Sequence, residues 1–185
     1  MKIFLIAACL LLKHFCFAQT VRSYDIGDTL PPIRINNLMD QHGSIDLQLL
    51  KGKLIILDFW AINCGSCIAG MPKLDSLQQL FSDKLQIILV TRDSIAAIKK
   101  LFSRVKIKQP NLPMVVEDKL LSSYFPYEFV PHHVWINESG VVKFITSGNN
   151  TNQTTLTAYF NRQSLAFNKQ ASLSNFDVSQ PTWLE

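Results

Sequence analysis

The chain has 185 residues, of which 48% are hydrophobic and 17% are charged, and its formal net charge is +4. That length fits one domain with a sizeable apolar core. So small a net charge provides no strong basic field, which excludes nucleic-acid binding as a main function.

The first 18 residues have the composition of a secretory signal peptide. Met1-Lys2 gives a basic start, residues 3–12 are apolar, and Ala18 supplies a small residue at the expected cleavage point. The apolar run is too short for a comfortable membrane span. The sequence therefore predicts export to the periplasm or another extracytoplasmic compartment. The alternatives are an uncleaved N-terminal anchor and a lipoprotein with lipid on Cys9.

Cleavage after Ala18 would leave Cys64 and Cys67 as the only cysteines and would lower the net charge to +2, because Lys2 and Lys13 are lost with the leader. Exported domains that use disulfides as scaffolding usually carry several pairs that close long loops. One pair that closes so small a loop restricts the unfolded chain very little. Redox chemistry is the better interpretation of this pair.

Hydrophobic periodicity predicts strands and helices in an order typical of an α/β domain. A weak hairpin comes first, within residues 33–45, and a continuous apolar run over 54–59 indicates a strand buried on both faces. Helices are predicted over 67–81, 94–104, 118–125 and 155–167, further strands over 85–90 and 113–116, and a second hairpin over 134–145 around Asn137-Glu138-Ser139-Gly140. These elements predict a central mixed sheet with helices on both faces.

The two cysteines lie where such a fold activates a thiol. Cys64 follows the buried strand, and Cys67 falls in the first turn of the next helix. The free N–H groups at a helix N-terminus stabilise a thiolate there and lower its pKa below the ordinary value of about 8.5. Cys64 is thus predicted to attack, and the more buried Cys67 to resolve the mixed disulfide.

Several motifs in order resemble the thioredoxin superfamily, specifically the exported TlpA/ResA-like thiol–disulfide oxidoreductases, which share an AhpC/TSA-related redoxin domain. They are DFWAINCGSC from Asp58 to Cys67, Pro72 five residues later, and VPHHVWINESGVV from Val130. The resemblance covers roughly residues 25–165. It implies a thioredoxin-like fold over 19–168 with an N-terminal β-hairpin extension, followed by a loosely ordered tail over 169–185.

The resemblance also implies roles for individual residues. The Val130–Pro131 bond is expected to be cis, which places the Val130 backbone beside the disulfide, where it can pair with an extended substrate. Asp58 is expected behind the disulfide as the acceptor of the Cys67 proton. Trp60, Asn63 and His132 join Val130 and Pro131 as expected substrate contacts, with His132 and His133 on a polar rim.

Three residues depart from the family pattern. Asn63 replaces a frequent aromatic residue, which predicts a more polar mouth. Ser66 replaces the proline that is frequent between the cysteines, which predicts a looser loop and a less reducing couple than in thioredoxin. Gly70 stands where ResA-like proteins have a glutamate, so Asp58 is expected to take over its role, and close packing is expected at this glycine.

The sequence therefore predicts an envelope thiol–disulfide oxidoreductase that reduces protein disulfides, for example in cytochrome c maturation. It is expected to act as a monomer, without a cofactor or metal, on protein partners that carry disulfides or thiols. A membrane-bound electron-transfer partner is expected to reduce its disulfide back to the dithiol. A copper-delivery module using Cys64, Cys67 and one of the histidines is an alternative. A peroxiredoxin is a further alternative, although Ala61-Ile62-Asn63 does not match the Thr/Ser and Pro framework of that family.

Overall fold

The computed structural model describes residues 22–39, 43–167 and 169. The predicted signal peptide over 1–18 and all but one residue of the predicted tail over 169–185 lie outside the described residues. No helix in the described part of the chain has the length and apolar character needed to cross a membrane.

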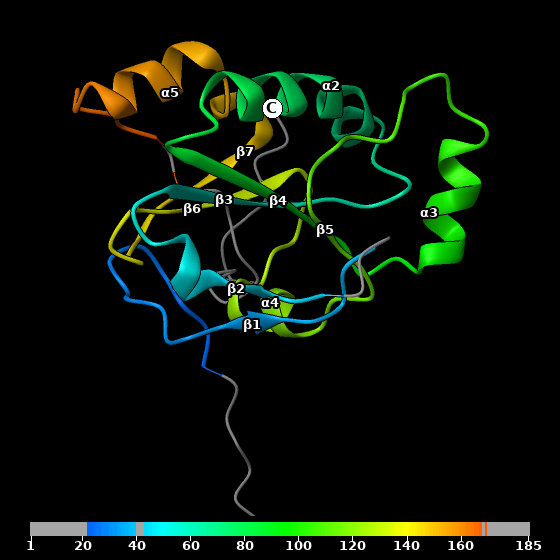
Figure 1. The fold of residues 1–185 in the computed structure, drawn as a ribbon, viewed down its shortest axis with the longest axis horizontal. Helices are drawn as coiled ribbons and strands as arrows, with labels where there is room; N and C mark the ends of the chain where they lie inside the picture. The colour runs from blue at the N-terminus through cyan, green and yellow to red at the C-terminus, as the bar shows by residue number, and fades with distance from the viewer. Residues whose placement is uncertain (1–21, 40–42, 168, 170–185) are drawn as a thin grey trace, which may run out of the picture.

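A five-stranded mixed sheet forms the centre of the fold, in the order β5-β4-β3-β6-β7 (Figure 1). Its strands are β3 (Leu54–Phe59), β4 (Leu85–Val90), β5 (Met114–Val115), β6 (His132–Ile136) and β7 (Val142–Ser147). β3 pairs with β4 in parallel and with β6 in antiparallel orientation. All six residues of β3 are buried, which confirms the central strand predicted from the apolar run.

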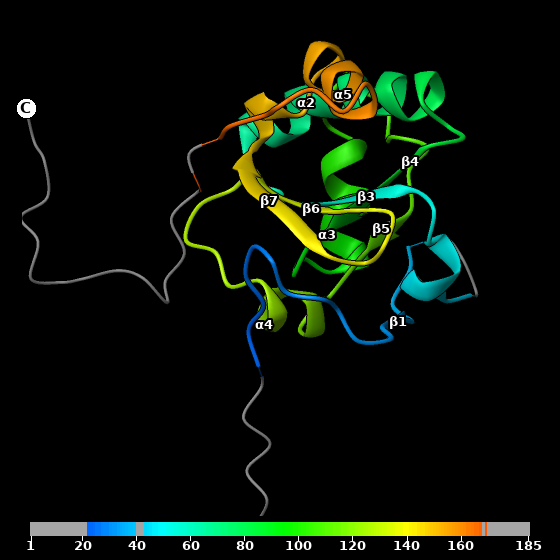
Figure 2. The ribbon, with the colours of Figure 1, turned by 90° about the vertical axis from the view of Figure 1, so that its left-hand side faces the viewer.

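Helices and a small N-terminal sheet cover the two faces of this sheet. α2 (Gly65–Leu80), α3 (Ile95–Phe102) and α5 (Gln153–Phe160) contribute buried side chains to the core on one face. α4 (Leu120–Tyr124) and the antiparallel pair β1 (Arg34–Ile35) and β2 (Ile45–Asp46) contribute to the core on the other. Both views show α2 and α5 on the opposite side of the sheet from α4 and β1 (Figures 1 and 2). The predicted mixed sheet with helices on both faces is confirmed.

Strand alternation decides which side chains of β3 and β6 face α2. Leu54 and Ile56 belong to the core beneath α2, whereas Ile55 and Leu57 belong to the opposite core. Asp58, two residues beyond Ile56, therefore faces α2. His133 is the Cα partner of Asp58 across β3 and β6, and His132 is the partner of Phe59, so the two histidines lie on opposite faces.

The turn chemistry of the late hairpin is as its sequence predicts. Gly140 has a φ of 85°, a conformation that glycine adopts without steric cost. The Asn137 side chain accepts hydrogen bonds from the backbone N–H groups of Ser139 and Val141. This turn joins β6 to β7 and so fixes the register of the strand that carries the two histidines.

The last helix is shorter than predicted. α5 ends at Phe160, whereas apolar spacing predicted helix as far as residue 167. Arg162 takes a left-handed φ of 57°, and Gln163 N–H donates to the carbonyl of Ala158 while Arg162 N–H donates to that of Tyr159. This is a Schellman ending that has an arginine in place of the usual glycine, so residue type does not indicate where the helix ends.

Candidate redox site at the start of helix α2

Cys64 and Cys67 form a disulfide at the N-terminus of α2. Cys64 is the N-cap residue, and the backbone N–H of Cys67 donates to its Sγ at 3.2 Å. Cys64 is half-buried, whereas Cys67 is only 4% exposed. The more exposed of the two cysteines, Cys64, is therefore the one whose sulfur faces the open N–H groups of the helix, which is the arrangement that stabilises an attacking thiolate.

The segment before β6 lies against the disulfide. The Val130–Pro131 peptide bond is cis, as the resemblance implied. The carbonyl oxygen of Val130 lies 3.7 Å from Cys64 Sγ, and both Val130 and Pro131 are half-buried. The backbone of residue 130 is thus adjacent to the sulfur at which a substrate would arrive.

Asp58 and His133 form a buried pair on the α2 side of the sheet. His133 Nε2 lies 3.0 Å from Asp58 Oδ1, and the two side chains are 2% and 4% exposed. The contact is close but is not aligned as a hydrogen bond, since Oδ1 has no hydrogen-bond partner among the described residues. On the other side of the ring, Nδ1 lies 2.6 Å from the hydroxyl of buried Thr151.

A cavity of about 420 Å³ connects this pair to the disulfide. Asp58, Cys67, Gly70, Pro131 and His133 are among its lining residues. A β-carbon added at Gly70 would meet nothing within 4 Å, so the prediction of close packing at this glycine is wrong. The space that a longer side chain would fill at position 70 is part of this cavity.

Two of the predicted substrate contacts are buried. Trp60 is 1% exposed, packs in the core beneath α2 and contacts the Phe102 ring. His132 is also 1% exposed and, on the opposite face, contacts both the Phe59 and the Tyr127 rings, which also contact each other. The expectation that the histidines form a polar rim is therefore wrong. Asn63 is exposed beside Cys64, where a polar residue was expected to shape the mouth.

The geometry does not favour the copper-delivery alternative. His132 faces away from the cysteines, and His133 is engaged by Asp58 and Thr151. Within residues 22–39, 43–167 and 169, no group of three or more His, Cys, Asp or Glu side chains is placed to hold a metal ion.

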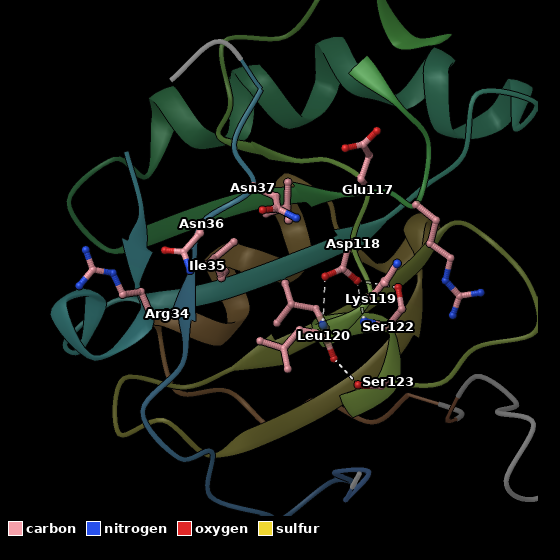
Figure 3. A pocket seen from close by; sticks show the side chains of 13 residues that line it. Arg34, Ile35, Asn36, Asn37, Glu117, Asp118, Lys119, Leu120, Ser122 and Ser123 are labelled. Atoms are coloured by element: carbon pink, nitrogen blue, oxygen red, sulfur yellow. Dashed lines mark hydrogen bonds between the residues drawn. The ribbon is translucent and has the colours of Figure 1, made fainter. Parts of the chain in front are cut away.

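A larger hollow of about 900 Å³ lies on the other face, next to α4 (Figure 3). Its charged lining residues are Arg34, Arg92, Glu117, Asp118 and Lys119. Asp118 is not available for a ligand, because its carboxylate accepts hydrogen bonds from the backbone N–H groups of Leu121 and Ser122 at the start of α4. No cysteine lines this hollow, whereas Cys67 lines the smaller cavity.

Comparison with known proteins agrees with this geometry. The Redoxin family matches residues 25–161. The chain belongs to the Redoxin family. "Thioredoxin-like protein YneN" of Bacillus subtilis is 27% identical over 126 residues, which span 68% of this chain and 73% of that protein. "Thiol-disulfide oxidoreductase ResA" of Oceanobacillus iheyensis is 30% identical over 73 residues, 38% of each chain.

Solved structures support the fold of this redoxin. The putative thiol:disulfide interchange protein DsbE from Chlorobium tepidum superposes with a TM-score of 0.58 at 21% identity, covering 76% of this chain and 96% of that one. The thioredoxin domain of a thiol-disulfide oxidoreductase from Bacteroides vulgatus gives 0.57 at 22% identity, covering 76% and 98%. The predicted TlpA/ResA-like thioredoxin fold and the thiol–disulfide oxidoreductase class are confirmed.

Sequence reasoning did not assign His133 and Thr151 to the redox site. The sequence suggests His133 only as a metal ligand or a rim residue and indicates no role for Thr151. Counting strand alternation back from Trp135, a residue in the core beneath α2, would have put His133 on the face of Asp58. Nothing in the sequence identifies Thr151 as its partner, because the connection runs through the turn after β7.

Proposed function

We propose that this redoxin reduces disulfides of proteins in the cell envelope through the Cys64–Cys67 couple. The observation that carries the proposal is the different exposure of the two cysteines. One sulfur is accessible at the helix N-terminus, and the other is buried over a cavity that holds a carboxylate.

In the first step, the Cys64 thiolate attacks one sulfur of a substrate disulfide. A bond forms between Cys64 Sγ and that sulfur, the substrate S–S bond breaks, and the leaving thiolate takes a proton from water. The Val130 backbone, beside Cys64, orients the incoming chain as an added extended segment. Asn63, exposed next to Cys64, contacts the substrate at the rim.

In the second step, Cys67 resolves the mixed disulfide. Asp58 accepts the Cys67 thiol proton across the shared cavity, and the resulting thiolate attacks Cys64 Sγ. The Cys64–Cys67 bond forms, the bond to the substrate breaks, and the second substrate thiolate departs. The protein is then oxidised by two electrons and the substrate is reduced by two.

Return to the dithiol needs a second dithiol that donates two electrons by the same exchange. We assign this role to a membrane-bound electron-transfer partner, because the apolar residues 3–12 and Ala18 favour export, away from cytoplasmic reductants. Disulfides in cytochrome c maturation are one substrate class that fits such a compartment. The redoxin is proposed to act as a monomer.

Trapping tests the proposal directly. The Cys67→Ser variant, reduced and mixed with oxidised insulin, should accumulate a covalent adduct on Cys64 that mass spectrometry detects and dithiothreitol releases. The matched Cys64→Ser variant should form no adduct and should lose insulin reduction. The proposal fails if Cys64→Ser reduces insulin as fast as the wild-type protein.

Export is tested separately. Protein recovered from the envelope fraction should begin at Gln19, as read by N-terminal sequencing. Protein that retains Met1 and stays in the cytoplasmic fraction would contradict the assignment of the compartment without affecting the chemistry of the couple.

A further inference from the structure

The buried partner of Asp58 is a second titratable group that the redox steps above do not use. The strand register brings His133 opposite Asp58, with Nε2 at 3.0 Å from Oδ1. Thr151 fixes the other ring nitrogen at 2.6 Å, and both members of the pair line the cavity shared with Cys67. The Thr151 contact thus fixes the ring beside the proposed proton acceptor.

We propose that His133 is a positioning residue that holds Asp58 toward Cys67 and makes the strength of Asp58 as a base depend on pH. The inference rests on the proposed function, since it concerns the step in which Asp58 takes the Cys67 proton. Neutral His133, with its proton on Nε2, faces Oδ1 and leaves the second carboxylate oxygen for that proton. In this tautomer Nδ1 accepts a hydrogen bond from the Thr151 hydroxyl.

Protonation of the His133 ring would make Asp58 a weaker base. An imidazolium beside a carboxylate stabilises its ionised form, so the carboxylate takes a proton less readily. Histidine is the side chain that ordinarily changes charge between about pH 5 and 8. The Cys67 step is therefore slower when the His133 ring is charged than when it is neutral.

Few other charges face this pair. On α2 the cavity is lined by Lys73, whose Nζ is exposed and lies 3.2 Å from the Gly148 carbonyl, and by the Cys67 sulfur. The remaining polar residues of the cavity wall, Ser66, Ser147 and Asn149, carry no charge. Lys73 is held at the solvent side, so the ring of His133 is the group that couples most closely to Asp58.

The experiment isolates the Cys67 step with Ellman's disulfide as the probe. The reduced protein releases one thionitrobenzoate when Cys64 attacks and a second when Cys67 displaces the first adduct, and both are followed at one wavelength by stopped flow. Thionitrobenzoate leaves as the thiolate across this pH range, so the pH profile of the second phase reports on the attacking side.

The conservative variant His133→Gln keeps a neutral donor toward Asp58 but cannot become charged. The ratio of its second-phase rate at pH 8 to that at pH 5 should be roughly threefold to tenfold smaller than the wild-type ratio, whatever its absolute rate. Thr151→Val removes the acceptor that an imidazolium needs on Nδ1, so it should also lower the ratio of the rate at pH 8 to that at pH 5. This second variant keeps the test sharp if His133→Gln folds poorly.

Thr146→Val is the matched control. Thr146 is buried, is the Cα partner of His133 on β7, and its hydroxyl has no hydrogen-bond partner among the described residues. This variant should keep the wild-type ratio of rates at pH 8 and pH 5. A folding or packing defect would slow the second phase equally at both pH values and leave the ratio of rates unchanged, whereas His133→Gln and Thr151→Val should change that ratio.

Two results would overturn the inference: a wild-type pH ratio in both His133→Gln and Thr151→Val, or an equal slowing of both at all pH values. Failure of the proposed function has a different signature, because the wild-type protein itself would then release no thionitrobenzoate from Cys64 or show no second phase.

Discussion

Gly148 is the position where one added methyl group should test the geometry of the site most sharply. A β-carbon there would lie 3.0 Å from Pro131 Cβ, 3.2 Å from Pro131 Cγ and 3.4 Å from His133 Nε2. Carbon atoms in contact prefer a separation of about 3.5–4.0 Å. The methyl group of Gly148→Ala therefore needs a shift of about half an ångström in Pro131 or in the turn that carries residue 148.

The expected cost follows from two opposing terms. Adding a methyl group to a packed site costs about 1–3 kcal/mol in strain. Replacing glycine reduces the freedom of the unfolded chain and returns about 0.4–1 kcal/mol, which applies because Gly148 does not have a positive φ. The free energy of unfolding of the variant should thus be about 1–2 kcal/mol lower than that of the wild-type protein. Displacement of Pro131 should also raise the KM for insulin.

Gly70→Ala is the matched control, because Gly70 lines the same cavity and its added β-carbon meets nothing within 4 Å. Alanine in a helix interior is favoured over glycine by about 0.8–1.0 kcal/mol, so this variant should be more stable than the wild-type protein. Urea unfolding of the oxidised proteins, followed by circular dichroism, measures both changes. The reasoning is refuted if Gly148→Ala is as stable as the wild-type protein with an unchanged KM.

Three further predictions follow from single contacts. Asp58→Asn should slow insulin reduction by about a hundredfold. Adding Gly70→Glu, whose carboxylate would enter the same cavity, should restore about tenfold of that loss. If the second substitution restores no activity, the cavity does not serve proton transfer. Ser66→Pro should lower the reduction potential of the couple by about 10–20 mV in a glutathione titration, because a stiffer loop favours the closed disulfide. A higher reduction potential would contradict this. Burial, with the neighbouring Glu138 carboxylate, raises the pKa of Tyr159, so its contribution to stability is complete below the unfolded-state pKa of about 10 and is lost as the pH rises further. In urea unfolding between about pH 9 and 11, the free energy of unfolding of Tyr159→Phe should therefore fall less steeply with pH than that of the wild-type protein. An equal fall in both proteins would count against the contact.

The sequence predicted the features that depend on local pattern. The apolar run of β3 and the hairpin turn with Gly140 both have the conformations their residues favour. Apolar spacing predicts a helix from residue 67, directly after the buried strand, and so predicts Cys64 at the helix N-terminus, where the structure has it. The cis bond before Pro131 came from the family resemblance, since most X–Pro bonds are trans.

What the sequence did not predict depends on contacts between distant segments. His132 and His133 are adjacent in the chain, but pleating sends them to opposite faces, and only the pairing register shows which one meets Asp58. The open space at Gly70 results from the separation of α2 and the turn after β7. The early end of α5 depends on a left-handed arginine, a conformation that residue type does not reveal.

The reduction potential of the Cys64–Cys67 couple tests the central claim most directly. The oxidised and reduced forms are equilibrated with defined ratios of dithiothreitol or glutathione, quenched with an alkylating agent and counted by mass spectrometry. A reductase requires a potential closer to that of thioredoxin, about −270 mV, than to that of the oxidant DsbA, about −120 mV, and the account predicts the former. A potential near −120 mV, or a pair that does not equilibrate with either buffer, would contradict it.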